Sequence, residues 1–275
     1  MDAASQADLR HRLGAAGIDH PQKEIDLILA RANGDAKAFD EMISRRLKRE
    51  PLERIFGEAT FYNLTFKLHP AVFKPCFETE TTMEYGLLHL KDRQGPVRIL
   101  DLGTGTGCIL LTLLHQLPNA TGLGIDINLA ALEIARNNAI THGLADRAEF
   151  RQGNWLDGID ETFDLVISNP PRVPSEVVPY LVLEVSKYDP KDSVDGGPSG
   201  IEFYQLTAKD FRRVANDEAL AVMQIGGIVA DQALLALRKA GYPSAEIRRD
   251  YKMGPNAIVF GKDPEAKGLW ARLFG

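Results

Sequence analysis

The stretch Ile99-Leu100-Asp101-Leu102-Gly103-Thr104-Gly105-Thr106-Gly107 decides the fold of this chain. Its apolar first half predicts a buried strand, and its second half is a glycine-rich turn that opens a helix. Glycines at alternate positions let the backbone approach a ligand closely, in conformations that a Cβ atom would obstruct. A loop of this kind also suits a dinucleotide, so the stretch predicts a cofactor site without identifying the cofactor.

Short apolar runs alternate with helical patterns from Val97 onward. We expect strands over residues 98–102, 122–127, 148–152, 165–168, 220–225, 246–250 and 258–261. We expect helices between them over residues 108–116, 129–142, 200–214 and 231–240. Strands separated by helices of this length predict an α/β fold with a parallel, doubly wound sheet. The last two strands lack an intervening helix, so we expect an antiparallel hairpin at that edge.

The N-terminal part of the chain shows helical patterns and one candidate hairpin. Helices are expected over residues 21–32, 36–49 and 79–90. Within residues 61–73, the alternation Phe66-Lys67-Leu68-His69 follows a turn candidate at Tyr62-Asn63 and predicts a β-hairpin. The chain is thereby divided into a helical domain at 1–58, a hairpin linker at 59–76 and a sheet-bearing domain at 77–275.

Composition and charge limit the class of protein. The chain has 275 residues, a formal net charge of −6, 44% hydrophobic residues, 25% charged residues and 2 cysteines. This balance excludes wholesale disorder and a disulfide framework, and it provides no diffuse attraction for nucleic acid. No apolar run approaches the ~20 residues of a membrane span, and the first residues lack a signal-peptide core. We therefore expect a soluble, cytoplasmic protein without a metal site.

One basic cluster stands out at the end of the second expected N-terminal helix. It comprises Arg45, Arg46, Lys48 and Arg49. Such a cluster is most simply a solvated helix face, and the alternative is a contact with an acidic or nucleic-acid-bearing partner. The sequence leaves both interpretations open.

Polar side chains follow four successive strands at the point where each strand ends. Asp126, with Ile127 beside it, follows the glycine loop by ~20 residues, where a carboxylate can accept hydrogen bonds from ribose hydroxyls. Asn154 and Trp155 then offer an amide for an adenine amino group and an aromatic face beside it. Asn169-Pro170-Pro171 ends the fourth strand. Each feature has a simpler interpretation (a helix cap, a core tryptophan, a proline loop), but their order favours one ligand site.

The segment 101–107, Asp126 and Asn169-Pro170-Pro171 together resemble the signature of class I S-adenosylmethionine-dependent methyltransferases. The chain further resembles the release-factor glutamine methyltransferases over residues 40–262, at Arg45-Arg46, Glu50-Pro51-Leu52, Gly57, Phe61, Thr79-Glu80, Tyr188-Asp189-Pro190, Asp195-Gly196-Gly197, Gly200 and Tyr204. This resemblance implies S-adenosyl-L-methionine as cofactor and a peptide chain release factor as partner. It also implies a Rossmann-like seven-stranded sheet, joined by a β-hairpin to a small helical domain on which the substrate docks.

The resemblance assigns roles to individual residues. On the cofactor side these are Asp101, Gly103, Thr104, Gly105, Gly107, Asp126, Ile127, Asn154, Trp155 and Asn169. A glutamine amide nitrogen is a poor nucleophile, because its lone pair is delocalised into the carbonyl, and acceptors on both N–H bonds favour the developing sp³ character. In the family an asparagine side-chain oxygen and a proline carbonyl are these acceptors, which implies catalytic roles for Asn169 and Pro170. The implied substrate-binding residues are Pro171, Arg172, Phe77 and Glu80.

Departures from the family pattern gather on the acceptor side. Arg172 stands where the family has an aromatic residue, and Cys76-Phe77 replaces part of its Pro-Arg-Pro-Asp motif. Gln224 stands where the family has an acidic residue. An arginine brings a charge near a cationic cofactor, but it also offers a flat stacking face or a fork for a carboxylate.

Three functions are compatible with this pattern. The first is methylation of a release-factor glutamine. The second keeps the scaffold but uses a small, amino-acid-like acceptor whose carboxylate pairs with Arg172. The third is a non-catalytic binding protein that retains the cofactor fold. Methylation of a nucleic-acid base ranks last, because related enzymes stack a flipped base on an aromatic residue that position 172 lacks.

Overall fold

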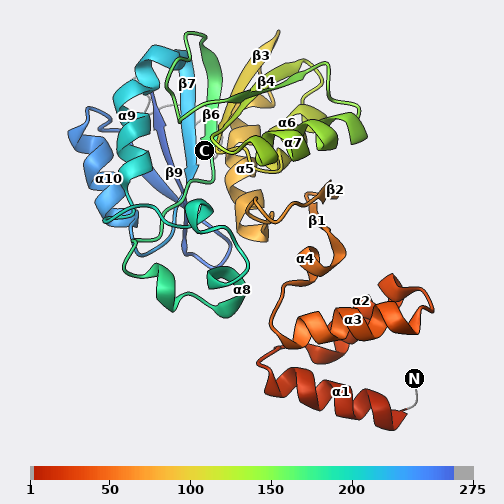
Figure 1. Ribbon diagram of the computed structural model, residues 1–275. Coiled ribbons are helices and arrows are strands. Elements are labelled where there is room, and N and C mark those ends of the chain that lie inside the picture. Colours follow the sequence, from red (N-terminus) through yellow and green to blue (C-terminus); the bar gives the residue numbers. More distant parts are fainter. Residues whose placement is uncertain (1–2, 263–275) are drawn as a thin grey trace.

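Residues 3–262 are described by the computed structural model, and a seven-stranded sheet forms the middle of its larger part (Figure 1). Its strands are β3 (Val97–Leu102), β4 (Ala120–Asp126), β5 (Ala148–Gln152), β6 (Phe163–Ser168), β7 (Ala215–Gln224), β8 (Glu246–Arg249) and β9 (Pro255–Gly261). The spatial order is β5-β4-β3-β6-β7-β9-β8, and every pair is parallel except the two that involve β9. The predicted α/β class, doubly wound sheet and antiparallel edge are confirmed.

The strand order reverses at β3, which pairs with β4 on one side and with β6 on the other. Such a switch point opens a crevice beyond the carboxyl ends of the strands. Leu102 lies opposite both Ile125 and Ser168, so these three strands end nearly level with one another. The fold therefore brings the glycine loop, Asp126 and Asn169 to one edge of the sheet.

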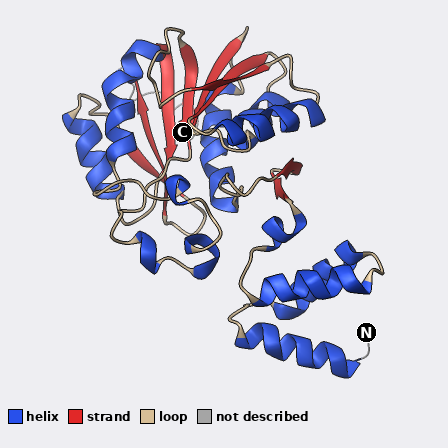
Figure 2. Ribbon diagram, in the orientation of Figure 1, coloured by secondary structure: helices blue, strands red, loops and turns tan. Residues whose placement is uncertain are grey.

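Helices cover both faces of the sheet (Figure 2). The helices are α5 (Phe77–Leu90), α6 (Cys108–Gln116) and α7 (Leu129–Thr141) on one face, and α9 (Glu202–Val214) and α10 (Ala230–Lys239) on the other. Each face of the sheet has its own hydrophobic core, and alternate residues of the central strands point into one or the other. Ile99 and Leu165 pack with α5–α7, whereas Leu100 and Val166 pack with α9 and α10. Because both faces are buried, the central strands β3 and β6 are mostly apolar, as the sequence indicates.

The N-terminal part consists of α1 (Ala3–Ala15), α2 (Pro21–Ala32), α3 (Ala36–Leu47) and α4 (Leu52–Phe56), followed by the hairpin β1 (Glu58–Phe61) and β2 (Leu64–Lys67). The first three helices share a small core of their own. Asp35 caps α3 by accepting hydrogen bonds from the backbone N–H groups of Lys37 and Ala38. Tyr62 and Asn63 make the hairpin turn with φ of 48° and 66°, the left-handed values that a tight turn of this type requires.

The predicted hairpin is present, but it lies earlier than residues 61–73 because its first strand begins at Glu58. Its second strand ends at Lys67, and Pro70 and Pro75 keep the following segment irregular because proline cannot donate to a strand ladder. The sheet strand predicted at 220–225 begins earlier, at Ala215. The first residues of this strand are polar, so an apolar run does not mark them. Asn216 donates a hydrogen bond to Asp164 on the neighbouring strand.

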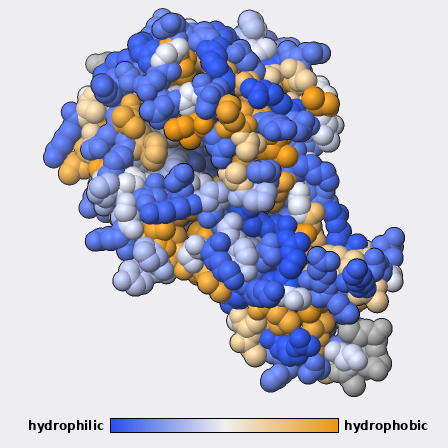
Figure 3. All heavy atoms as spheres, viewed as in Figure 1, coloured by the Kyte–Doolittle hydropathy of each residue, from blue (hydrophilic) through white to orange (hydrophobic). Residues whose placement is uncertain are grey.

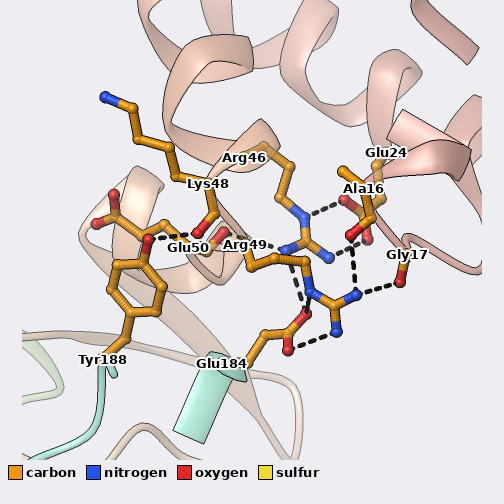
Figure 4. Close-up of polar contacts among 9 residues, drawn as sticks. All are labelled: Ala16, Gly17, Glu24, Arg46, Lys48, Arg49, Glu50, Glu184 and Tyr188. Atoms are coloured by element: carbon orange, nitrogen blue, oxygen red, sulfur yellow. Dashed lines mark hydrogen bonds and ion pairs between the residues drawn. The ribbon is translucent and has the colours of Figure 1, made fainter. Parts of the chain in front are cut away.

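Two members of the basic cluster at the end of α3, Arg46 and Arg49, form ion pairs within the molecule, whereas Lys48 is exposed, so the interpretation as a solvated helix face is wrong for these two arginines. Arg49 forms an ion pair of 2.7 Å with Glu184 of α8 (Leu183–Ser186). Arg46 lies between Glu24, at 3.1 Å, and Glu184, at 3.5 Å (Figure 4). The acidic partners are thus Glu24 of α2 and Glu184 of α8 in the same chain, and no local sequence pattern indicates the pairing with Glu184.

Further polar contacts hold the N-terminal helices to the sheet-bearing part. The hydroxyl of Tyr188 donates a hydrogen bond of 2.6 Å to the Lys48 carbonyl. Arg54 forms an ion pair of 2.6 Å with Asp189, and both side chains are nearly excluded from solvent. In the space-filling view, hydrophilic atoms gather where the N-terminal helices meet the rest of the molecule (Figure 3). The two parts are therefore joined by charge pairing as well as by the hairpin.

Two absences apply to residues 3–262. None of their helices is long and apolar enough to cross a membrane. Nor does this part of the chain contain a cluster of three or more His, Cys, Asp or Glu residues arranged to hold a metal ion.

Candidate active site

The glycine loop between β3 and α6 forms the floor of the candidate site. Gly103, Gly105 and Gly107 have φ of 68°, 55° and 79°, in the region that L side chains rarely adopt. A Cβ at Gly103 would meet no atom within 4 Å, so open space lies above the loop. A Cβ at Gly107 would instead lie 3.1 Å from Leu111, where the loop turns into the helix. The first two glycines therefore leave room for a ligand, and the third allows close packing.

Asp101 lies beneath the loop and is fully buried. Its Oδ2 accepts a hydrogen bond of 2.7 Å from the hydroxyl of Thr104. Its Oδ1 makes no hydrogen bond within residues 3–262. Burial raises the pKa of this carboxyl to about 7, although the Thr104 hydrogen bond lowers it. A carboxylate of this kind is stabilised by a cationic group placed beside it.

Asp126, at the end of β4, fixes the neighbouring backbone. Its two oxygens accept hydrogen bonds of 2.9 Å from the N–H groups of Gly105 and Asn128. Burial raises the pKa of this carboxyl as well. Ile127, the next residue, is exposed at the rim. The carboxylate is thus held on the glycine loop, in the position where the sequence predicts recognition of a ribose.

Asn154 and Trp155 are neighbours in the sequence but lie in different environments. Asn154 is exposed and donates a hydrogen bond of 3.2 Å to Asp157, so its amide remains a predicted contact for adenine. The Trp155 ring is 9% exposed and packs in the core against Phe203. Its Nε1 donates to the Thr207 hydroxyl at 2.8 Å. Trp155 has a φ of 58°. Contact of its ring with adenine stays a prediction.

The acceptor side is built around Asn169. Its Nδ2 donates a hydrogen bond of 3.2 Å to the Thr79 hydroxyl, and its Oδ1 accepts one of 2.6 Å from Nη1 of Arg172. The same Nη1 lies 3.3 Å from the carbonyl oxygen of Pro170. Two acceptors predicted to serve a substrate amide therefore converge on one nitrogen, which here belongs to the protein.

Thr79 is a site residue that the sequence analysis did not select. It lies in the first turn of α5, and its hydroxyl donates a hydrogen bond of 2.6 Å to Oε1 of the buried Gln224. The thiol of Cys76 lies 3.0 Å from the same hydroxyl, and burial raises the pKa of this thiol. Cys76 is therefore a protonated thiol at neutral pH. The only sequence signal for Thr79 was its place in a family motif.

Two predicted substrate-binding residues lie beside this network in different settings. Glu80 accepts a hydrogen bond of 2.8 Å from the backbone N–H of Tyr62, so it holds the hairpin turn. Phe77 is 59% exposed and contacts the exposed Tyr251 edge to face. A substrate contact through Phe77 stays a prediction. The observed contact of Glu80 is within the chain.

The loop fits S-adenosyl-L-methionine in shape and charge. Open space lies above Gly103, and the unpartnered Oδ1 of the buried Asp101 would suit the ammonium of the cofactor's amino-acid portion. Contacts of Asp126 with the ribose and of Asn154 with adenine stay predictions. When bound, the cofactor supplies a methyl group activated on a sulfonium. The chain's own residues bind it and orient the acceptor.

Fold and site define a class I methyltransferase with a Rossmann-like sheet and S-adenosyl-L-methionine as cofactor. Residues 94–230 match the family model described as a methyltransferase domain. The fold is similar to that of a methyltransferase from Pyrococcus furiosus, with a TM-score of 0.53, 16% identity and coverage of 80% of this chain and 96% of that chain.

More similar relatives narrow the assignment. The chain is 40% identical to a release factor glutamine methyltransferase of Bradyrhizobium diazoefficiens, over 79% of this chain and 75% of the relative. It is 36% identical to a release factor glutamine methyltransferase of Agrobacterium fabrum, over 94% of this chain and 98% of the relative. The chain belongs to the release factor glutamine methyltransferase family.

Proposed function

We propose that the protein transfers a methyl group from S-adenosyl-L-methionine to the side-chain amide nitrogen of a glutamine in a peptide chain release factor. One observation carries the proposal for the site. Asn169 Oδ1 and the Pro170 carbonyl oxygen lie within 2.6 Å and 3.3 Å of a single NH₂ nitrogen. The two oxygens therefore have the spacing needed to accept both hydrogens of a primary amide.

The chemistry follows from that spacing. As the amide nitrogen attacks the methyl group, it gains positive charge, so its two N–H bonds become stronger donors. Acceptors held in place stabilise this developing charge without reorganising. They also keep the lone pair directed at the methyl group, since an in-line displacement depends above all on positioning. One of the two protons is released to solvent or a neighbouring base after transfer.

We further propose that the helices of residues 1–58 form the surface on which the release factor docks. Arg49 and Arg46 tie α3 to Glu184, which lies in the segment that follows the Asn-Pro-Pro motif. The buried Arg54–Asp189 pair fixes the same segment from below the hairpin. A protein substrate bound to the helices would thus be held at a constant distance from Asn169.

The test uses isotope-labelled S-adenosyl-L-methionine with a purified release factor and with a deproteinised cell extract, offered separately. We expect label on the release factor, at one glutamine located by mass spectrometry, and no label after that glutamine is replaced by glutamate. The Asn169→Ala enzyme serves as a control that binds cofactor but transfers little label. Cofactor binding without transfer to any release factor contradicts the proposal.

A second candidate is supported by the charge of Arg172. Within residues 3–262, Arg172 forms no ion pair with a carboxylate. A small amino-acid-like acceptor would supply one. Label that moves only to the deproteinised fraction supports this candidate, and loss of that transfer in the Arg172→Met enzyme would link it to the guanidinium.

A further inference from the structure

Arg172 occupies the place that the proposed mechanism reserves for the substrate. Its Nη1 carries two hydrogens in one plane, as does the nitrogen of a primary amide. This nitrogen donates to both Asn169 Oδ1 and the Pro170 carbonyl, at 2.6 Å and 3.3 Å. A glutamine amide and this guanidinium group therefore require the same two oxygens and cannot hold them together.

The backbone at this position is fixed, so only the side chain is able to move. A Cβ at Gly196 would lie 2.7 Å from Cα of Arg172, and one at Gly200 would lie 2.7 Å from its carbonyl oxygen. Beyond it, Val173 donates a hydrogen bond to Val194 and accepts one from Gly196. Two close glycine contacts and a short β-bridge thus hold the chain on both sides of the arginine.

The side chain itself is held only by neutral acceptors. The side chain is partly exposed, and it passes Gly226, where a Cβ would be in van der Waals contact with its Nε at 3.7 Å. No carboxylate within residues 3–262 pairs with the guanidinium. Hydrogen bonds to an amide and a carbonyl are exchanged for water at modest net cost, so the group is able to swing into solvent.

We infer that Arg172 is a specificity-determining residue that fills the acceptor position in the resting enzyme and competes with the substrate amide. This inference rests on the proposed function. A free amide or a short peptide must displace the guanidinium with its own binding energy. A large protein substrate docked elsewhere on the chain brings additional binding energy to that exchange. The arginine therefore selects for glutamines presented by a docked protein.

The kinetic test compares the wild type with Arg172→Met, which keeps the length of the side chain and removes its donors. The acceptor is a short glutamine-containing peptide from the release factor. We expect its KM to fall about five- to thirtyfold in Arg172→Met, the range set by the loss of one or two competing hydrogen bonds. Arg238→Met, on α10 away from the site, is the matched control and keeps the wild-type KM. An equal or higher KM in Arg172→Met overturns the inference.

A binding test separates this inference from the proposed function. Methylguanidinium should bind Arg172→Met, measured by isothermal titration calorimetry, and should inhibit it competitively with the peptide. The wild type and the double variant Arg172→Met/Asn169→Ala should bind it at least tenfold more weakly. Binding with this pattern but without methylation of any glutamine would support the position of Arg172 at the acceptor oxygens and would reject the proposed function. Methylation with neither binding nor a fall in KM would reject the arginine's role alone.

Discussion

The hydroxyl of Thr79 accepts a hydrogen bond from Nδ2 of Asn169 at 3.2 Å. Thr79 donates its own hydrogen to Oε1 of Gln224 at 2.6 Å, so towards Asn169 it offers only a lone pair. The amide of Asn169 must therefore turn its NH₂ to Thr79 and its oxygen to the acceptor position. A glutamate at position 224 would accept the same hydrogen bond. This explains how a glutamine is tolerated where the resemblance implies an acid.

Replacing Thr79 by valine tests this orienting role. Valine keeps the shape of the side chain but removes the lone pair that fixes the Asn169 amide. We expect kcat to fall about tenfold, with little change in the dissociation constant of the cofactor, because the lost interaction acts on the reacting amide. Single-turnover transfer to the release factor measures the first quantity, and calorimetry measures the second.

The matched control for that variant is Thr79→Ser, which restores the hydroxyl without the methyl group. It should recover most of the lost kcat. If serine and valine lower kcat equally, the methyl packing rather than the hydroxyl is responsible, and the orienting role of Thr79 is wrong.

Asp126→Ala should weaken cofactor binding rather than catalysis. The variant loses the charged acceptor proposed for the ribose, and it frees the N–H groups of Gly105 and Asn128 that now hold the loop. We expect a loss of about 1–3 kcal/mol in cofactor binding free energy, measured by calorimetry. Asp146→Ala, an exposed aspartate away from the loop, is the control and should bind normally. A normal affinity in Asp126→Ala would exclude this carboxylate from the site.

The buried Asp101 predicts a pH dependence. Its pKa of about 7 in the folded chain lies above the ordinary value of 3.8, so between these values the folded state holds a proton that the unfolded state has released. The stability that this group contributes is complete below the ordinary pKa and is lost as the pH rises through about 7. A cationic ligand favours the carboxylate form, so its binding should release a proton.

Calorimetry of cofactor binding in buffers of different ionisation enthalpy checks that expectation. Affinity should rise from about pH 6 to about pH 7.5, with proton release below the pKa of Asp101. Asp101→Asn should bind more weakly and lose both effects, because its amide does not titrate. The same pH dependence in Asp101→Asn would assign the proton to another group.

Much of the fold could be predicted from the sequence because the local patterns of apolar runs and helices agree with the parallel sheet that the chain forms. The apolar runs of β3 and β6 are buried on both faces, and each is separated from its parallel neighbours by helices of ordinary length. The ends of individual strands were predicted less well. The start of β7 was missed because its first residues are polar and pair through polar groups. The hairpin turn at Tyr62-Asn63 was predictable from turn chemistry, but its end at Lys67 depended on two later prolines.

The site was predictable only in its backbone elements. The glycine loop, Asp126 and Asn169 follow the ends of neighbouring strands, so the sheet register brings them together independently of side-chain conformation. The direction of each side chain depends on contacts between distant segments, which a single sequence does not encode locally. The Trp155 ring turned into the core, and the Arg172 side chain turned back on Asn169. Arg49 found its acidic partner 135 residues along the chain.

The buried ion pair of Arg54 and Asp189 predicts a large loss of stability when one partner is removed. Nε and Nη2 of Arg54 both donate to Asp189 Oδ1, at 3.2 Å and 2.6 Å. Burial raises the pKa of Asp189, and Arg54 opposes that shift. Arg54→Met leaves this carboxylate unpaired, so we expect the free energy of unfolding to fall by about 3–5 kcal/mol in urea denaturation.

The double variant Arg54→Met/Asp189→Leu should recover much of the lost stability, since no charge is then buried. Arg45→Met, which removes a more exposed pair with Glu50, should cost about 1 kcal/mol or less. Equal losses in the Arg54 and Arg45 variants would mean that burial of the Arg54 pair carries no special weight in joining the helices to the sheet-bearing part.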